Sequence, residues 1–415
     1  MKKQSVVVIG AGIVGVSTAL WLLRDGHEVV LVDKQGPAAG TSYGNGGIVV
    51  PSGIVPINSP GLVKKIPGML MQSDSPLFIR WRYLPRLLPW LKTYLGQANE
   101  TGARKVAQAL KPLLHDCVEQ HRALAKGSGA QKWLTDSDYL FVYDNREMFV
   151  NDKFPWSIRR EFGFHWDEFS GAEFADYDAD FGDPNKFSIR LANHALVTNP
   201  GEYVKDLATE FQREGGKLVI AEVLDFDIDE SGIRAVISDQ GQMPCASAVV
   251  TAGIWSRHLV EKLALKIPLE SERGYHLDLI NPSHMPRSAM MMASAKFVVT
   301  PMQDRIRCAG LVEFAGLDAP PNQRAIALLK RQVKQLWPFL KYDSELEWMG
   351  HRPAPSDSIP FIGELEKIPG LYAAFGHHHV GLSAGPRSGR MIADLIAEKI
   401  PDINTDPYRV SRFTY

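Results

Sequence analysis

Near its start the chain has two apolar runs, residues 6–9 and 29–32, separated by an amphipathic stretch. Within that stretch apolar residues recur every three or four positions between Ile13 and Leu23, and Gly26 follows. This spacing is that of one helical face, and a glycine is a common residue just past a helix end. The pattern therefore predicts a strand, a helix and a second strand over residues 5–33.

Further along, the apolar pattern changes between helical and alternating periods. Residues 40–60 are rich in Gly, Ser, Pro and Asn and are predicted to form a loop. The helical period predicts helices over residues 101–126, 200–214, 324–336 and 383–398. Alternating or short apolar runs predict strands over residues 139–143, 187–191, 217–228, 233–237, 249–253, 273–280, 296–300 and 305–314.

The order of these elements predicts an α/β fold with two domains. Signals of a Rossmann-like nucleotide-binding domain occur at the start, near residues 197–260 and again after 345, and antiparallel signals fall between them. We therefore expect a discontinuous nucleotide-binding domain, interrupted by a smaller antiparallel α+β substrate domain. The predicted ranges are 1–55, 195–265 and 345–415 for the first domain, and 56–194 and 266–344 for the second.

A glycine-rich turn, Gly10-Ala11-Gly12-Ile13-Val14-Gly15, joins the first predicted strand to the first predicted helix. Gly10 permits the tight turn, Gly12 lets the backbone approach a pyrophosphate, and Gly15 lets the helix pack closely on the strand. The helix N-terminus adds unpaired N–H groups and a positive dipole. A dinucleotide site is predicted because the turn lies between a strand and a helix.

Asp33 ends the second predicted strand, where its carboxylate is placed to accept hydrogen bonds from a ribose. Lys34 follows it, but no arginine stands beside it to bind a 2′-phosphate. Asp33 thus completes the dinucleotide-binding pattern that begins with the glycine turn.

Composition narrows the class of protein. The chain has 415 residues, a formal net charge of −1 and 45% hydrophobic residues. This balance argues against nucleic-acid binding and is typical of a soluble globular protein. Cys117, Cys245 and Cys308 are widely spaced, which predicts no disulfide framework and a cytoplasmic location.

An alternative interpretation of the first residues is a signal peptide or a membrane helix. Lys2 and Lys3 precede an uncharged run over residues 5–23. However, the glycines fall where a phosphate turn needs them, and no small-residue cleavage site precedes residue 25. We expect no membrane-spanning segment here or elsewhere.

Six motifs, taken in order, resemble the D-amino-acid oxidase and dehydrogenase family of FAD flavoproteins, which includes glycine and sarcosine oxidases. They are residues 10–15, 40–47, 222–225, 251–256, the Gly-His-Arg-Pro of 350–353 with Asp357, Pro360 and Gly363, and residues 376–382. The resemblance covers essentially the whole chain. It implies that the first domain binds FAD and that the enzyme acts on an amino acid.

The resemblance also implies which residues contact FAD. The alternatives are an ordinary surface loop for 40–47, a plain strand residue at Val223 and a ligand-free turn at 251–253. The predicted cofactor-binding residues are Gly10, Gly12, Ile13, Val14, Gly15, Asp33, Lys34, Thr41, Ser42, Asn45, Gly46, Gly47, Val223, Thr251, Ala252, Gly253, Trp255, Gly350, Gly376, His378, His379, Val380, Gly381 and Leu382.

At the substrate end the resemblance implies that Arg352 pairs with the substrate carboxylate, a role that suits a planar guanidinium. The alternative is a structural pair with Asp357. Tyr275 and His276 begin a predicted strand and are further catalytic candidates, with an amphipathic tyrosine that touches no ligand as the alternative for Tyr275.

Two clusters have the residue types of a metal site but not the spacing. They are the three consecutive histidines 377–379 and the acids Asp176, Asp178 and Asp180. The histidines have no partner at zinc spacing, and Phe181 and Phe187 occupy positions where a calcium loop needs Gly and Glu. We expect no metal.

Residues 60–95 combine basic and aromatic residues with five prolines. They hold Lys64, Lys65, Arg80, Arg82, Arg86 and Lys92 against the single acid Asp74. Such a surface suits peripheral contact with an anionic membrane, on its cytoplasmic face, and electron transfer to quinone. The prolines favour the alternative, a part of the substrate domain packed on its own core.

The expected function is oxidative deamination of an amino acid of D configuration. In this family hydride leaves the α carbon of a neutral amine for flavin N5, and the imine hydrolyses to a 2-oxo acid and ammonia. We expect a non-oxygen electron acceptor. Alternatives are D-hydroxyproline, D-proline, glycine or N-methylglycine as substrate, a non-catalytic FAD-binding protein, and a subunit of a larger electron-transfer complex.

Overall fold

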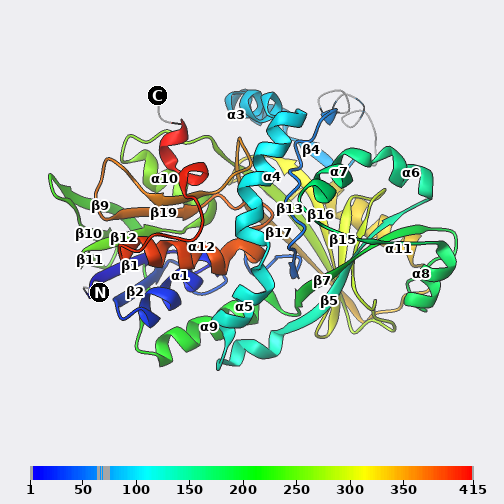
Figure 1. Ribbon diagram of the computed structural model, residues 1–415, viewed down its shortest axis with the longest axis horizontal. Helices are drawn as coiled ribbons and strands as arrows, with labels where there is room; N and C mark the ends of the chain where they lie inside the picture. Colours follow the sequence, from blue (N-terminus) through cyan, green and yellow to red (C-terminus); the bar gives the residue numbers. More distant parts are fainter. Residues whose placement is uncertain (1–2, 63–65, 67, 69–74, 414–415) are drawn as a thin grey trace.

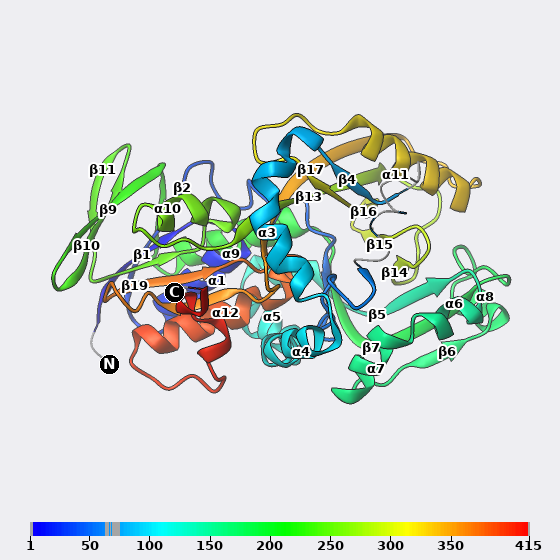
Figure 2. The same ribbon diagram turned by 90° about the horizontal axis from the view of Figure 1, so that it is seen from above.

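The computed structural model describes residues 3–62, 66, 68 and 75–413, which form two lobes (Figures 1 and 2). The first lobe is built on a six-stranded sheet and the second lobe on a ten-stranded sheet. Helix α4 (Glu100–Leu114) runs between them in the view of Figure 1, followed by α5 (Cys117–Ala125).

The sheet of the first lobe is mostly parallel. Its order is β18 (Phe361–Glu364), β19 (Leu371–Phe375), β12 (Ser247–Val250), β1 (Ser5–Ile9), β2 (Glu28–Asp33) and β8 (Lys217–Ile220), and only β18 and β19 pair antiparallel. Val6 and Val8 join the core on one face, whereas Val7 and Ile9 join the core on the other. Burial of both faces explains why this strand is a continuous apolar run.

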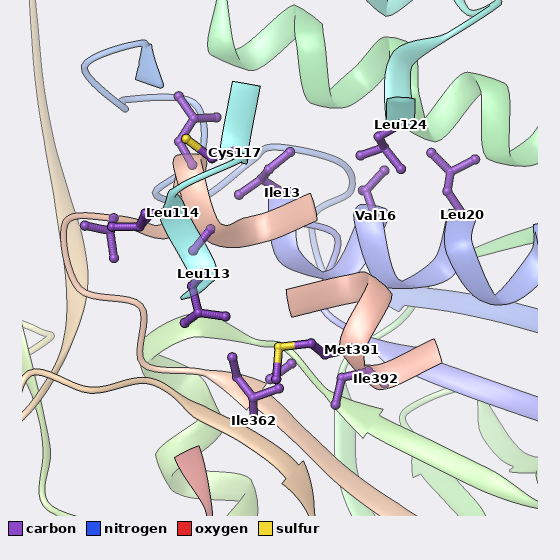
Figure 3. Packing of buried hydrophobic residues seen from close by; sticks show 14 of the residues in the cluster. Ile13, Val16, Leu20, Leu113, Leu114, Cys117, Leu124, Ile362, Met391 and Ile392 are labelled. Carbon is purple, nitrogen blue, oxygen red and sulfur yellow. The ribbon is translucent and has the colours of Figure 1, made fainter. Parts of the chain in front are cut away.

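Helices α1 (Ile13–Arg24), α9 (Pro200–Arg213) and α12 (Gly381–Ile396) share the hydrophobic core on one face of this sheet (Figure 3). Gly389 of α12 lies against the α1 backbone, where a Cβ atom would come within 2.7 Å of the Thr18 nitrogen. The first and last long helices therefore pack closely. The other face carries η3 (Gly253–Trp255), α10 (Ser256–Glu261) and a small sheet of β9 (Val223–Asp229), β10 (Gly232–Ser238) and β11 (Gly241–Pro244).

The sheet of the second lobe is mixed. Its order is β17 (Ser344–Pro355), β13 (Leu269–Ile280), β16 (Arg305–Phe314), β15 (Phe297–Met302), β14 (Ala289–Met292), β5 (Leu134–Tyr143), β7 (Phe187–Val197) and β3 (Ile48–Val49), with β4 (Leu77–Ile79) beside β16 and β6 (Asp167–Phe169) beside β7. Strands β13 and β17 pair along their whole length. Helix α11 (Gln323–Leu336) covers one face.

The remaining elements border these lobes. They are η1 (Trp81–Tyr83), α3 (Leu84–Gly96), η2 (Gly129–Trp133), α6 (Arg146–Asn151), α7 (Lys153–Glu161), α8 (Gly171–Tyr177), η4 (Asp406–Tyr408) and η5 (Val410–Phe413).

The fold class expected from the sequence is confirmed, as is the strand, helix and strand over residues 5–33. Two details differ. The single helix expected over 101–126 is two helices, because Pro112 lies in the last turn of α4 and the chain turns before Cys117. Strand β17 was not expected, and it belongs to the second-lobe sheet although it follows the boundary placed near residue 345. The division into domains stays a prediction.

Candidate active site

A cavity opens at the carboxyl ends of β1, β2 and β12, the edge where parallel sheets bind ligands. Asp33 and Val223 line one end of it, and Asn45, Pro353 and His378 line the other. The lining includes these residues from the predicted set: Gly10, Gly12, Ile13, Val14, Asp33, Lys34, Thr41, Ser42, Asn45, Val223, Thr251, Ala252, Gly253, Trp255, Gly376, His378, Gly381 and Leu382. It does not include Gly15, Gly46, Gly47, Gly350, His379, Val380, Arg352, Tyr275 or His276.

The glycine turn leaves no space for side chains. Gly10 has a φ of 105°, and a Cβ on Gly15 would lie 1.8 Å from the Gly10 carbonyl oxygen. Helix α1 begins after Gly12, which offers no side-chain cap, so most N–H groups of its first turn remain free to bind an anion at the cavity. Gly15 thus acts by close packing rather than by lining the cavity.

Asp33 is held at the end of β2 by backbone donors. Its carboxylate accepts hydrogen bonds from the amides of Ala11 at 2.8 Å, Gln35 at 2.8 Å and Gly36 at 2.9 Å. Beside it, the Lys34 ammonium lies 5.3 Å from the ring centre of Trp255, and both residues line the cavity.

The loop of residues 40–47 connects the two lobes. On the first lobe, the Ser42 hydroxyl accepts a hydrogen bond from the Ile13 amide at 2.9 Å and so caps α1. On the second lobe, the Thr41 hydroxyl donates to the His351 carbonyl at 2.8 Å. Two adjacent residues of this loop therefore tie it to both lobes.

Four consecutive carbonyls of that loop accept hydrogen bonds from the second-lobe sheet. Arg307 donates to the carbonyl of residue 43 at 3.0 Å and to the carbonyl of residue 45 at 2.8 Å. His276 donates to the carbonyl of residue 44 at 3.1 Å, and Thr300 donates to the carbonyl of residue 46 at 2.7 Å. Asp278 holds Arg307 through two bonds of 2.7 and 2.8 Å. We call Arg307, Asp278, His276 and Thr300 the loop clamp.

Burial and the Arg307 guanidinium together set the charges of the loop clamp. Burial alone would raise the pKa of Asp278, but Arg307 outweighs it and holds this pKa below its usual range. Burial, and then the charge of Arg307, lower the pKa of His276 to about 4. His276 is therefore neutral and donates from Nδ1 to a carbonyl, which makes it a structural residue here rather than a free base.

Trp348 lies between Gly44 and Gly350, of which Gly350 was predicted to bind the cofactor. A Cβ on Gly44 would lie 2.0 Å from its ring, and a Cβ on Gly350 would lie 1.9 Å from it. The ring also stacks on His276, with centres 5.0 Å apart. Gly350 thus makes space for an indole that the sequence analysis did not single out.

Tyr275 and His276 point to opposite faces of β13 because side chains alternate along a strand. His276 faces the loop of 40–47, whereas Tyr275 is 1% exposed in the core beneath α11. Its hydroxyl donates to Glu313 at 2.5 Å and accepts from the Asn322 amide at 2.9 Å. Burial and then Glu313 raise its pKa to about 12. This position offers no hydroxyl to a substrate.

Arg352 lies on the face of the sheet that carries Glu272 and His276. Its Nη1 donates to Glu272 at 3.0 Å and to the Leu311 carbonyl at 3.1 Å. Its guanidinium lies over Gly274, where a Cβ would come within 2.3 Å of it. The alternative pair with Asp357 is wrong, because Asp357 pairs with Arg412 at 2.8 Å.

Glu272 joins Arg352 to the histidine segment. Its other oxygen accepts from Nε2 of His378 at 2.8 Å, and both side chains are buried. Burial alone would raise the pKa of Glu272, but His378 and then Arg352 outweigh it and lower the pKa to about 2. The carboxylate of Glu272 thus stays charged, paired with Arg352 on one side and hydrogen-bonded to His378 on the other.

The three histidines diverge. His377 bonds the Ser388 hydroxyl at 2.9 Å, His378 bonds Glu272, and His379 lies with its Nδ1 3.3 Å from that of His378. Within the part of the chain that the structure describes, no three His, Cys, Asp or Glu side chains are grouped to hold a metal ion.

Comparison with known proteins places this chain in a family. A family model described as "FAD dependent oxidoreductase" matches residues 5–395. The chain belongs to the FAD-dependent oxidoreductase family. It is similar to a D-amino-acid oxidase of Bradyrhizobium diazoefficiens, at 37% identity over 99% of both chains. It also resembles a D-amino acid dehydrogenase of Rhizorhabdus wittichii, at 29% identity over 99% of this chain and 100% of that protein.

Solved structures share the fold. Glycine oxidase from Bacillus cereus matches with a TM-score of 0.74 and 20% identity over 100% of both chains. L-proline dehydrogenase from P. horikoshii matches with a TM-score of 0.74 and 18% identity over 99% of this chain and 98% of the other. At these identities the matches show the fold alone.

The residues of this FAD-dependent oxidoreductase fit its cofactor. At the start of α1 the Ser42 hydroxyl caps the Ile13 amide, the remaining N–H groups of the first turn supply donors for the pyrophosphate, and Gly10 and Gly12 leave the backbone exposed at the cavity. At the other end, α12 also starts without a side-chain cap, and Gly381 and Leu382 line the cavity. A helix start there favours negative charge on a bound ring.

Several lining residues were absent from the sequence prediction. Three of them, Ile9, Val32 and Phe375, lie at the carboxyl ends of their strands. They could have been predicted, because ligands bind at that edge of a parallel sheet. Others carried no motif of their own: Gln35, Ala39, Ala221, His258, Leu259 and Ala374.

Proposed function

We propose that this FAD-dependent oxidoreductase oxidises D-amino acids to 2-oxo acids and ammonia, with Arg352 binding the substrate carboxylate. FAD, when bound, supplies the hydride acceptor. The position of Arg352 carries the proposal. Arg352 is adjacent in β17 to Pro353, which lines the cavity, and its side chain is held by Glu272 and the Leu311 carbonyl. The names of the relatives at 37% and 29% identity support the D configuration.

Arg352 keeps donors for a ligand. Only its Nη1 is bonded to acceptors among the described residues, and its side chain is 22% exposed. The remaining edge of a guanidinium offers two parallel N–H groups, which match the two oxygens of a carboxylate. Because Arg352 is fixed on its other side, a carboxylate bound there is held in one orientation, and so is the α carbon attached to it.

The test is an anaerobic screen of D- and L-amino acids, with D-proline, glycine and N-methylglycine included, that follows bleaching of the flavin absorbance. We expect D-amino acids to bleach it. Arg352→Ala should leave the flavin bound and raise the substrate concentration for half-maximal bleaching about 100-fold, because charged hydrogen bonds contribute about 1.5–3 kcal/mol. Arg352→Lys, which keeps the charge without the fork, should give a smaller rise.

Arg190→Ala is the matched control for Arg352→Ala. Arg190 pairs with Asp138 at 2.8 Å in the same sheet and does not line the cavity. Its loss should leave saturation unchanged. If Arg352→Ala saturates like the wild type, the carboxylate assignment is wrong; if only glycine or an L-amino acid bleaches the flavin, the proposed substrate class is wrong.

We further propose that the electrons pass to a quinone at an anionic membrane, which the surface of η1 and α3 contacts. Trp81 is 64% exposed and Leu88 is 53% exposed, beside the exposed residues Arg80, Arg82 and Arg86. The opposite side of α3 packs its Leu87, Trp90 and Tyr94 on the second lobe. Lys64, Lys65 and Asp74 of this region lie outside the described residues.

Across the described part of the chain, no helix combines the length and apolar character that crossing a membrane requires. Co-sedimentation with anionic and neutral lipid vesicles tests the surface contact, which should need anionic lipid and weaken in Arg82→Glu. Reoxidation of the reduced flavin should be fast with a soluble quinone and slow with oxygen. Fast reoxidation by oxygen would make the protein an oxidase.

A further inference from the structure

Glu272 places a negative charge directly behind the guanidinium of Arg352. The two side chains are joined by the 3.0 Å hydrogen bond from Nη1, and Glu272 is 1% exposed. Its other oxygen is bonded to Nε2 of His378 at 2.8 Å, and His378 lines the cavity. The negative charge therefore lies close to the space for a ligand, with one side chain between them.

The surroundings hold this carboxylate in place. The His378 amide donates to the Pro353 carbonyl at 3.0 Å, so the chain before α12 is tied to β17 next to Arg352. One oxygen of Glu272 has Arg352 as its partner and the other oxygen has His378. Glu272 therefore acts on a molecule in the cavity through its charge, at a distance, rather than by a hydrogen bond.

The pair of Arg352 with Glu272 is separate from the other charges nearby. Within the described part of the chain, no second carboxylate pairs with Arg352. The neighbouring Arg273 points to the opposite face of β13, where it pairs with Glu313 at 3.3 Å. Any anion that binds Arg352 is thus bound to a guanidinium whose charge Glu272 already balances.

Substrate and product of the proposed reaction differ in net charge. The amino acid enters as a zwitterion, with its carboxylate and its ammonium group on one carbon atom. The 2-oxo acid has lost the ammonium group and is a monoanion. Glu272 repels the carboxylate of either molecule, but in the zwitterion its attraction for the ammonium group offsets that repulsion. Because the Arg352 side chain is mostly buried, salt and water screen these interactions weakly.

We propose that Glu272 makes the Arg352 site selective for zwitterionic amino acids over monoanionic carboxylates, so that the 2-oxo acid leaves once it has formed. The inference rests on the proposed function, in which Arg352 binds the substrate carboxylate. A bound monoanion gives the pair of Arg352 with Glu272 an uncompensated negative charge, whereas a bound zwitterion does not. Glu272 is thus a specificity-determining residue that does not touch the substrate.

The test compares three ligands that share a carbon skeleton: D-alanine, propionate and pyruvate. Anaerobic flavin reduction at increasing D-alanine gives its dissociation constant, and shifts of the oxidised flavin spectrum give those of the two anions. Glu272→Gln keeps the shape of the side chain and removes its charge. It should bind both anions about 10-fold more tightly and D-alanine within about threefold of wild type. If D-alanine does not bleach the flavin, the matching three ligands of a D-amino acid that does are used.

A purely structural role predicts the opposite sign. If Glu272 only held Arg352 in place, Glu272→Gln would weaken all three ligands together, and unchanged or uniformly weaker binding would overturn the proposal. Glu272→Asp keeps the charge and should keep the wild-type ratio of dissociation constants. Asp138→Asn is the matched control, because it removes a carboxylate from a pair with Arg190 at 2.8 Å in the same sheet. It should leave all three constants unchanged.

Product inhibition of the wild type covers the case in which Glu272→Gln does not fold. Pyruvate should compete with D-alanine only at concentrations about 10-fold above the dissociation constant of D-alanine. Pyruvate that binds as tightly as D-alanine would overturn the selectivity.

The two proposals fail in different ways. If no amine bleaches the flavin, or if Arg352→Ala binds all three ligands like the wild type, the proposed function fails and the selectivity fails with it. If Arg352→Ala weakens all three ligands while Glu272→Gln leaves the ratio of their dissociation constants unchanged, only the role given to Glu272 is wrong.

Discussion

The two ends of the cavity are built in different ways. At the end near α1 the contacts come mainly from backbone, with crowded glycines and the N–H groups of the helix start that Ser42 leaves free. At the end near β13 and β17 they come from charged side chains, with Glu272 between Arg352 and His378, and Arg307 paired with Asp278. Adding one carbon atom to a glycine should therefore disrupt the backbone end. Removing one charged group should disrupt the side-chain end.

The largest effect should come from Gly15→Ala at the backbone end. The new Cβ would lie 1.8 Å from the Gly10 carbonyl oxygen, so the turn and the helix start cannot keep their positions. We expect protein purified with almost no flavin, measured as the ratio of visible to ultraviolet absorbance. A fully yellow, stable Gly15→Ala protein would contradict the tight packing described here.

Acid should destabilise the fold as a whole, including the side-chain end. Burial lowers the pKa of several histidines to about 4, whereas an unfolded histidine has a pKa of about 6.5. The unfolded chain therefore binds protons in this window that the folded chain does not, so stability is lost as pH falls from about 6.5 to 4. Each fully buried ring contributes up to about 3 kcal/mol to that loss. The histidines are His121, His194, His276, His351 and His377.

Urea unfolding at pH 7 and pH 5 measures this loss. We expect a clearly lower midpoint at pH 5, and His194→Gln should reduce the difference between the two midpoints. Equal midpoints in the wild type would show that these rings are not buried in neutral form.

Arg307→Met should break the loop clamp. It leaves Asp278 buried without its main partner and frees two carbonyls of the loop of residues 40–47, at a cost of about 3–5 kcal/mol. We expect a lower urea midpoint together with a shifted flavin spectrum. Arg412→Met is the matched control, because Arg412 pairs with Asp357 away from that loop. It should lower stability without altering the spectrum.

Tyr275→Phe should have a smaller effect, on stability alone. Glu313 loses a donor and the Asn322 amide loses an acceptor, which costs about 1–2 kcal/mol. Saturation with substrate should stay as in wild type. If half-maximal bleaching needed more substrate, Tyr275 would be a substrate-binding residue and not only a residue of the core.

The smallest effect should come from Gly26→Ala, which sharpens the contrast with Gly15→Ala. Gly26 has a φ of 91°, but a Cβ there would meet no atom within 4 Å. The cost is that of a left-handed backbone alone, about 1 kcal/mol. Thermal unfolding should detect it, and flavin content should not change.

The same contrast explains what could be predicted from sequence. Gly10, Gly12 and Gly15 are recognisable because the absence of a side chain is itself the requirement, and a strand and a helix flank them. Tyr275 and His276 are adjacent, so residue type alone does not reveal that they face opposite sides of β13. Their positions depend on which strands pair with it.

Strand β17 shows the second limit. Its residues 344–355 include two prolines, a glycine and several charges, and only pairing with β13 along its whole length makes it a strand. The roles of Glu272, Trp348 and Arg307 depend on that pairing and its neighbours. None of the three stands in a motif, so the loop clamp and the pair of Arg352 with Glu272 were not predictable.

The close packing of α1 against α12 has a consequence for how the protein is made in the cell. Gln4 donates to the Ile396 carbonyl, and Trp21 donates to the Pro386 carbonyl, so α1 and α12, which are synthesised far apart in time, are neighbours. The nascent chain cannot enclose the flavin until its final helix has emerged. We therefore expect the prosthetic group to bind only once α12 is available, and truncation shortly before α12 should yield a colourless polypeptide.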